Sequence, residues 1–136
     1  MTLKERADAL ARVPVFAGLS RASLERIARI TKDVELRAGQ LLIEPRAKGS
    51  GMFVLLDGVV TVGSGGSRVR ELGPGDIVGE LALLTPDAVR TARVRAKTPV
   101  RCLAITRNDF RKILADEPRV AIQVLETVAT RLASPL

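Results

Sequence analysis

The fold is decided by residues 73–92, which read GPGDIVGELALLTPDAVRTA. This stretch has the pattern of neither a plain strand nor a plain helix. A glycine-rich approach leads into the apolar run Leu81–Leu84, which is too short for an independent helix and is followed by Pro86. A strand pattern then begins at Arg90. The segment therefore predicts one short helical turn between two strands.

Several features of this segment suit an anionic ligand. The first N–H groups of a short helical turn, near Leu81 and Ala82, have no partner within the turn, and their dipoles favour a negative charge. Gly79 lets the backbone approach a ligand closely. Arg90 can pair with a phosphate oxygen, and Thr91 can donate a hydroxyl hydrogen bond. We therefore expect these residues to hold a phosphate group.

Glu80 indicates a second chemical group in the same ligand. A carboxylate only accepts hydrogen bonds, so its natural partner is a sugar hydroxyl and not a phosphate. A site that holds both a phosphate and a ribose hydroxyl is a nucleotide site. Taken alone, Glu80 and Arg90 also fit a structural ion pair between two elements, and Thr91 also fits an ordinary β-branched strand residue.

Short strand patterns fill residues 31–106 around this segment. Turn signals rich in Gly, Pro, Asp and Ser separate β-rich runs at 34–36, 41–43, 52–56, 59–62, 68–72, 91–96 and 100–105. Regular short strands with such turns predict a β-sandwich or barrel. The alternation in 68–72 and 93–96 predicts strands with one solvent-exposed face. In the last run, alternation puts Cys102 on the buried face with Val100 and Ala104, so we expect an unreactive core thiol.

Helical patterns flank the strands on both sides. Apolar or small residues recur at helical spacing in 3–12, and Ser20 is a suitable N-cap for a second helix. After the strands, Thr106 or Asn108 can cap a helix and Pro118 can start another. The sequence predicts one domain over residues 1–136, with N-terminal helices in 1–30, strands in 31–106 and C-terminal helices in 107–133.

The sequence resembles the cyclic nucleotide-binding domain shared by the bacterial catabolite activator protein, protein kinase A regulatory subunits and cyclic nucleotide-gated channels. GELAL at 79–83 and RTA at 90–92 resemble the family's phosphate-binding cassette. MFVLLDGVVTV at 52–62 resembles its central hairpin, and FAGLS at 16–20 matches the approach to its second helix. The resemblance implies a mainly β fold, an eight-stranded, jelly-roll-like β-roll with flanking helices and a short cassette helix.

The resemblance also implies a role for each residue of the cassette segment, residues 79–92. Glu80 would accept a hydrogen bond from the ribose 2′-OH, and Arg90 would pair with the cyclic phosphate. Thr91 would lie beside the phosphate and the base. Close backbone contacts would come from Gly79, Leu81 and Ala82. In this family a hydroxyl at the position of Thr91 can favour guanine, but many cAMP binders also carry Ser or Thr there. The expected ligand is cAMP ahead of cGMP.

In this family the final helix covers the base as a lid and moves when ligand arrives. The lid candidates here are Val124, Leu125, Val128 and Arg131. For the apolar stripe over 120–132 the alternative is core packing or a dimer seam, and a homodimer through the C-terminal helix is a further hypothesis. For Arg131 the alternative is a solvated cation at the end of a helix.

Three features depart from the family pattern. Val78 stands where Phe is common, and Arg46 stands near a common Gly, so the turn at Arg46 is expected to differ. The winged helix-turn-helix of the family's transcription factors has no counterpart up to residue 136. The output is therefore expected from a protein partner or from a separate domain.

Composition excludes several classes of enzyme and metal site. The 136 residues contain no His and one Cys, which excludes Ser-His-Asp hydrolysis, His-ligated zinc and an internal disulfide. No general base, nucleophile or metal constellation is visible, so we expect a binding protein without catalytic activity, metal or cofactor. No apolar run reaches the roughly 18 residues of a membrane span, and no secretory signal is present, so the expected location is the cytoplasm.

The net charge of +7 suits an anionic ligand, a nucleic acid or an acidic partner. The arginines are scattered, and only three Phe residues could stack on bases, so nucleic acid is not the expected partner without a DNA-binding domain. Two alternatives stay open: a β-roll that no longer binds nucleotide and serves as a protein-interaction module, and a basic nucleic-acid-associated regulator. The absence of His argues against a metal-dependent, cupin-like enzyme.

Overall fold

The computed structural model describes residues 1–43, 51–63, 69–79 and 93–133, and the following account concerns these residues. The helices are α1 (Leu3–Ala11), the 3-10 helix η1 (Pro14–Phe16), α2 (Arg21–Arg29), α4 (Arg107–Asp116) and α5 (Pro118–Ala133). The strands are β1 (Lys32–Leu36), β2 (Leu41–Ile43), β3 (Gly51–Asp57), β4 (Val60–Gly63), β5 (Val69–Leu72), β6 (Ile77–Val78), β7 (Arg93–Ala96) and β8 (Val100–Thr106).

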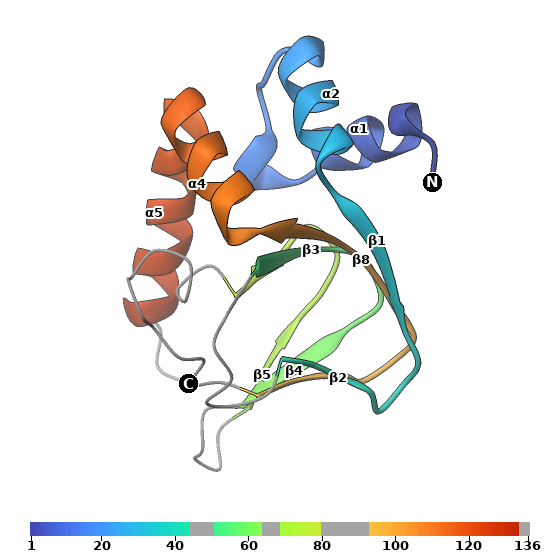
Figure 1. Ribbon diagram of the computed structural model, residues 1–136. Coiled ribbons are helices and arrows are strands. Elements are labelled where there is room, and N and C mark those ends of the chain that lie inside the picture. The colour runs from blue at the N-terminus through green and yellow to red at the C-terminus, as the bar shows by residue number, and fades with distance from the viewer. Residues whose placement is uncertain (44–50, 64–68, 80–92, 134–136) are drawn as a thin grey trace.

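The described strands form two antiparallel four-stranded sheets. Sheet A has the order β1-β8-β3-β6, and sheet B has the order β2-β7-β4-β5. Of the described helices, α1, η1, α2 and α4 lie on the outer side of sheet A, whereas α5 begins there and runs past the level of this sheet toward β5 of sheet B (Figure 1). Sheet B closes the other side of the roll. The predicted architecture, an eight-stranded β-roll with N-terminal and C-terminal helices, is confirmed.

The prediction that residues 52–62 form a hairpin of two paired strands is wrong. Strand β3 pairs with β8 and β6 in sheet A, whereas β4 pairs with β5 and β7 in sheet B. The chain passes from one sheet to the other at Gly58, which has a φ of +87°. A Cβ atom there would lie 2.1 Å from the Pro99 carbonyl oxygen, so this crossing requires glycine.

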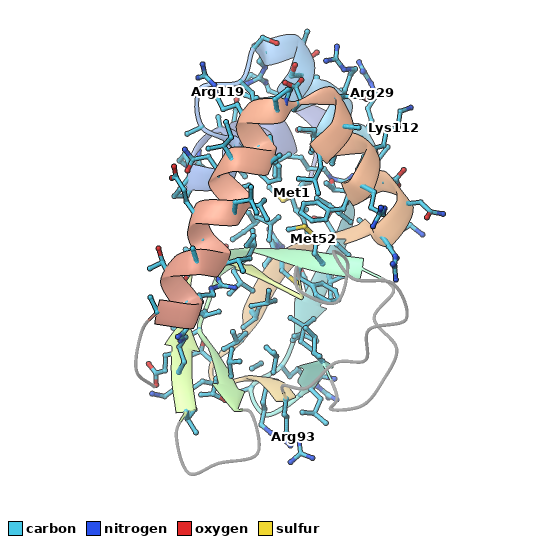
Figure 2. All side chains as sticks on the ribbon, turned by 90° about the vertical axis from the view of Figure 1, so that its left-hand side faces the viewer. Met1, Arg29, Met52, Arg93, Lys112 and Arg119 are labelled. Atoms are coloured by element: carbon cyan, nitrogen blue, oxygen red, sulfur yellow. The ribbon has the colours of Figure 1, made fainter. Side chains whose placement is uncertain are left out.

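Two hydrophobic cores lie on opposite faces of sheet A. The helix-side core joins the helices to the outer face of sheet A, and its largest fully buried side chains include Phe16, Phe110 and Met52. Figure 2 shows Met52 between the helices and the strands. The roll core fills the space between the two sheets with smaller side chains such as Val60, Val94 and Cys102. Sheet A is therefore buried on both faces.

Helix ends follow the capping residues in the sequence. The Ser20 side chain accepts a hydrogen bond from the Ser23 N–H at the start of α2, and Thr106 accepts one from the Asp109 N–H at the start of α4. Pro118 is the first residue of α5, where its missing N–H costs nothing. These predictions are confirmed, and Thr106, not Asn108, is the N-cap of α4.

The prediction of one solvent-exposed face is confirmed for β5 and β7, whose residues alternate in exposure. In β5, Val69 lies on the exposed face and is 60% exposed, whereas Arg70 is half-buried. Arg70 lies opposite Val62 in the register, and paired residues share a face, so Arg70 points to the same side as Val62. In β8, Cys102 is fully buried as expected but Ala104 is only half-buried. The opposite face of β8 is buried too, because Leu103 and Ile105 belong to the helix-side core.

Candidate functional site

The chain approaches the cassette segment through a turn held against β3. The Gly73 N–H donates to Asp76 Oδ2 at 2.9 Å, and the Gly75 N–H donates to the Leu55 carbonyl at 2.8 Å. The Leu55 N–H in turn donates to the Asp76 carbonyl at 2.9 Å. These bonds fix the start of β6, whose residues Ile77 and Val78 then pair with β3.

Gly79 is the first residue of the cassette segment and comes directly after β6. Its φ is +90°, in the left-handed region where a residue with a Cβ atom is strained. The residue that was predicted to give a ligand close backbone access therefore has a backbone conformation that favours glycine. The reason for glycine here is conformational, and this is compatible with the predicted contact.

The remaining cassette residues lie outside the described part of the chain. They are the predicted ligand contacts Glu80, Leu81, Ala82, Arg90 and Thr91, and the departure at Arg46 also lies outside it. On the far side of the segment, the first described residue is Arg93, which begins β7 and lies opposite Gly63 in sheet B. The cassette segment thus connects the edge strand of sheet A to sheet B.

The predicted lid residues of α5 divide between the core and the solvent. Val124 is 1% exposed in the helix-side core, and Val128 packs against the same core. Leu125 is 63% exposed. Packing of Val124 and Val128 fits the core-packing alternative for these positions, and Leu125 is available on the outer face of the helix.

The alternative interpretation of Arg131, a solvated cation at the end of a helix, is wrong. Its side chain is half-buried, and Nη2 donates a 2.6 Å hydrogen bond to the carbonyl oxygen of Ile77 in β6. The Arg70 Nη2 donates to the backbone carbonyl of Arg131 itself at 3.2 Å. The end of the predicted lid is therefore bonded to the strand that leads into Gly79.

Arg70 and Ile77 are structural neighbours of the site that the sequence interpretation missed. A signal for Arg70 was present: it lies two residues before Leu72, and residues two apart in a strand share a face. Leu72 packs against the roll core, so Arg70 had to point the same way. Nothing in the sequence indicated that its guanidinium would reach a helix more than fifty residues further along the chain.

The sequence comparisons decide the family. Residues 33–117 match the family described as cyclic nucleotide-binding domain. The chain belongs to this family.

Three similar proteins have names that describe different activities. The chain is 27% identical over 130 residues to the CRP-like cAMP-activated global transcriptional regulator of Mycobacterium tuberculosis, covering 92% of this chain and 58% of the regulator. It is 33% identical over 126 residues to a cyclic nucleotide-gated potassium channel of Rhizobium etli, covering 93% of this chain and 35% of the channel. The solved structure of a cAMP-binding acyltransferase from Mycobacterium smegmatis has a TM-score of 0.79 at 29% identity, covering 96% of this chain and 42% of that chain.

The chain therefore spans only part of the length of these relatives. Their names describe a transcriptional regulator, a channel and an acyltransferase, so the cyclic nucleotide-binding domain is the portion they have in common with this chain. Among the described residues, no helix combines the length and the apolar character needed to cross a membrane.

Two other features of this cyclic nucleotide-binding domain carry no ligand chemistry. Burial raises the pKa of the Cys102 thiol to about 11, which keeps it protonated and unreactive at neutral pH. Within the described ranges, no group of three or more Cys, Asp or Glu side chains could hold a metal ion.

A groove of about 140 Å³ lies between α2 and α4, on the helical side of the molecule. Ile27 and Ile113 line it together with charges of both signs, and an ion pair of 3.4 Å joins Arg26 to Glu117 there. Gly79 and the predicted lid residues, which the structure describes, do not line this groove.

Proposed function

We propose that this domain is a sensor that binds a cyclic mononucleotide in the cassette segment and transmits the binding event through α5. The observation that carries the proposal is the pair Glu80 and Arg90, in the cassette pattern of a chain that belongs to the cyclic nucleotide-binding family. The proposal assigns a regulatory binding role and no reaction.

The chemistry of the cassette residues fits a ribose joined to a cyclic phosphate. Glu80 accepts a hydrogen bond from the 2′-OH, and Arg90 supplies a charge-assisted contact to the phosphate. Thr91 donates a hydroxyl hydrogen bond beside the phosphate and the base. The backbone at Gly79, Leu81 and Ala82 approaches the ligand closely. The left-handed φ of Gly79 supports this arrangement, because a side chain at that point would be strained.

We favour cAMP over cGMP as the nucleotide. Support comes from the names of two similar proteins, the cAMP-activated regulator of M. tuberculosis and the cAMP-binding acyltransferase of M. smegmatis. A hydroxyl at Thr91 is compatible with either base. The two nucleotides are therefore compared directly in the experiment below.

The output of the proposed sensor lies in a protein partner or a further domain. The domain spanning 1–136 would act in the cytoplasm, and binding would shift α5 between two arrangements of different nucleotide affinity. Ile122 and Leu125 are 56% and 63% exposed, and they lie three residues apart on α5. We include a homodimer through this helix face in the proposal, because three-residue spacing puts two apolar side chains side by side.

The experiment is a thermal unfolding series with cAMP, cGMP and 5′-AMP. A ligand at one hundred times its dissociation constant adds about 2.7 kcal/mol of stability when it binds only the folded state. We expect a rise in melting temperature with cAMP, a smaller rise with cGMP at equal concentration, and none with 5′-AMP, which lacks the ring-closed phosphate. An unchanged melting temperature with both cyclic nucleotides would support the interaction-module alternative instead.

A further inference from the structure

The two halves of α5 are attached to the molecule in different ways. In the N-terminal half, Val120 and Val124 are 0% and 1% exposed in the helix-side core, and Arg119 donates to the Gly18 carbonyl at 3.3 Å. Further along, Val128 is only partly buried. Among the α5 side chains whose burial the structure describes, apolar burial therefore decreases from Val124 to Val128, and the last turn also makes polar contacts.

Two arginines supply those polar contacts, and we call them the arginine clasp: Arg70 in β5 and Arg131 in α5. Arg131 Nη2 donates to the Ile77 carbonyl at 2.6 Å, and Arg70 Nη2 donates to the Arg131 carbonyl at 3.2 Å. Both hydrogen bonds are partly buried and both have a charged donor, which makes them stronger than bonds between neutral groups.

The contact from Arg70 meets a specific need of the helix end. The last carbonyl groups of an α-helix have no partner within the helix, and the helix dipole favours a cation there. Arg70 lies in β5 of sheet B and donates a hydrogen bond to one of these carbonyl groups, that of Arg131. It does so from the inward face of β5, beside Val62, where an apolar residue would otherwise fit the alternation.

The contact from Arg131 connects the same turn to the start of the cassette segment. Its acceptor, Ile77, lies two residues before Gly79 in the two-residue strand β6. Strand β6 is at the edge of sheet A and pairs only with β3 among the described strands. A displacement of Gly79 can therefore be transmitted along two residues of the chain to the Ile77 carbonyl, which accepts the hydrogen bond from α5.

We infer that the arginine clasp couples the last turn of α5 to the cassette segment, and that Arg70 is a positioning residue for nucleotide binding. The inference rests on the proposed function and adds to it the contact that holds the lid near the site. Coupling between two sites is reciprocal. Loss of the clasp must therefore release the end of α5 and also weaken nucleotide binding.

The test compares Arg70→Gln, Arg70→Lys and the control Arg93→Gln in the full chain. Arg93 is an exposed arginine of β7, which lies in the same sheet as β5 but is separated from it by β4, at the end of the roll away from the helices (Figure 2). Hydrogen exchange without nucleotide should be about three- to tenfold faster in the last turn of α5 in Arg70→Gln, with β3 and β8 unchanged. Arg70→Lys should be intermediate because an ammonium still donates to the carbonyl, and Arg93→Gln should match the wild type.

Calorimetric titration with cAMP and cGMP forms the second arm. We expect Arg70→Gln to lower the affinity for whichever nucleotide binds the wild type more tightly by about three- to tenfold. Arg70→Lys should restore part of this affinity, and Arg93→Gln should leave it unchanged. Unchanged exchange in Arg70→Gln would show that the clasp does not hold the helix. Faster exchange with unchanged affinity would overturn the coupling. If the wild type binds neither nucleotide, the proposed function fails, and the exchange arm still decides whether the clasp holds α5.

Discussion

The helix-side core and the roll core differ in what they connect. The helix-side core includes Phe16 and Phe110 and joins the described helices to sheet A, whereas the roll core joins the two sheets with aliphatic side chains and Cys102. Sheet A belongs to both cores and also contains β6, which leads into Gly79. A change at the start of the cassette segment can therefore reach α5 through a single layer, without crossing the roll core.

The largest expected effect on stability comes from the helix-side core. Phe110 of α4 is fully buried there. Phe110→Ala should lower the free energy of unfolding by about 3–5 kcal/mol, because it removes a large buried side chain and leaves a cavity. Urea denaturation measures this loss. Lys112→Ala on the exposed face of the same helix is the control, with a change of about 0.5 kcal/mol or less. A loss below about 1 kcal/mol for Phe110→Ala would contradict the packing of α4.

The roll core should respond to polarity more than to volume. Cys102→Ser exchanges a sulfur for a hydroxyl with almost no change of shape, but it buries a polar group and should cost about 1–3 kcal/mol. Cys102→Ala, which introduces no hydroxyl, distinguishes the polar cost from the loss of volume.

The thiol itself offers a second measurement on the roll core. Because burial raises the pKa of the Cys102 thiol to about 11, its thiolate fraction at pH 8 is about a hundredfold lower than that of a thiol with a pKa of 9.0. Alkylation by iodoacetamide should be correspondingly slow in the folded protein and rapid in urea. Equal alkylation rates in the folded and unfolded protein would mean that Cys102 is accessible.

A smaller effect separates backbone strain from ligand binding. Gly79 and Gly39 have φ values of +90° and +91°, and a Cβ atom at Gly39 would meet nothing within 4 Å. Gly79→Ala and Gly39→Ala should each cost about 1–2 kcal/mol of stability through the same strain. Only Gly79→Ala should also lower the affinity for cAMP, as measured by calorimetric titration. Equal nucleotide affinity in the two variants would remove Gly79 from the site.

The smallest effect on stability is expected at the outer face of α5. Leu125→Gln changes a side chain that is 63% exposed, so the free energy of unfolding should change by about 0.5 kcal/mol or less. Analytical ultracentrifugation should show a weaker dimer for this variant than for the wild type. A monomeric wild type at all concentrations would contradict the homodimer proposal and leave the two cores unaffected.

Much of the fold could be predicted because its signals are local. The caps Ser20 and Thr106 and the first helical residue Pro118 act within one helical turn, and strand runs such as 41–43 are bounded by turn residues. Strand β6 was missed because two residues carry no periodicity, and it exists only through pairing with Phe53 and Val54. The central hairpin was wrong because a turn does not determine the sheet that each strand joins.

The sequence predicts the chemistry of the candidate site, but the contacts that surround it could not be predicted. Gly79, Glu80 and Arg90 follow a motif that is contiguous in the sequence, and the ligand roles of these residues remain predictions. The clasp depends on the register that puts Arg70 opposite Val62, and on a contact between residues 61 positions apart. Such contacts follow from tertiary packing, which single-residue properties do not encode.

Calorimetric titration of cAMP into the wild type, Arg90→Ala and the control Arg93→Ala tests binding at the cassette most directly. We expect saturable 1:1 binding to the wild type and to Arg93→Ala, and at least about a hundredfold weaker binding to Arg90→Ala, because the phosphate loses its charged partner. The thermal unfolding of the three unliganded proteins should be closely similar. Equal affinity in Arg90→Ala and the wild type would contradict a phosphate-binding role for this segment.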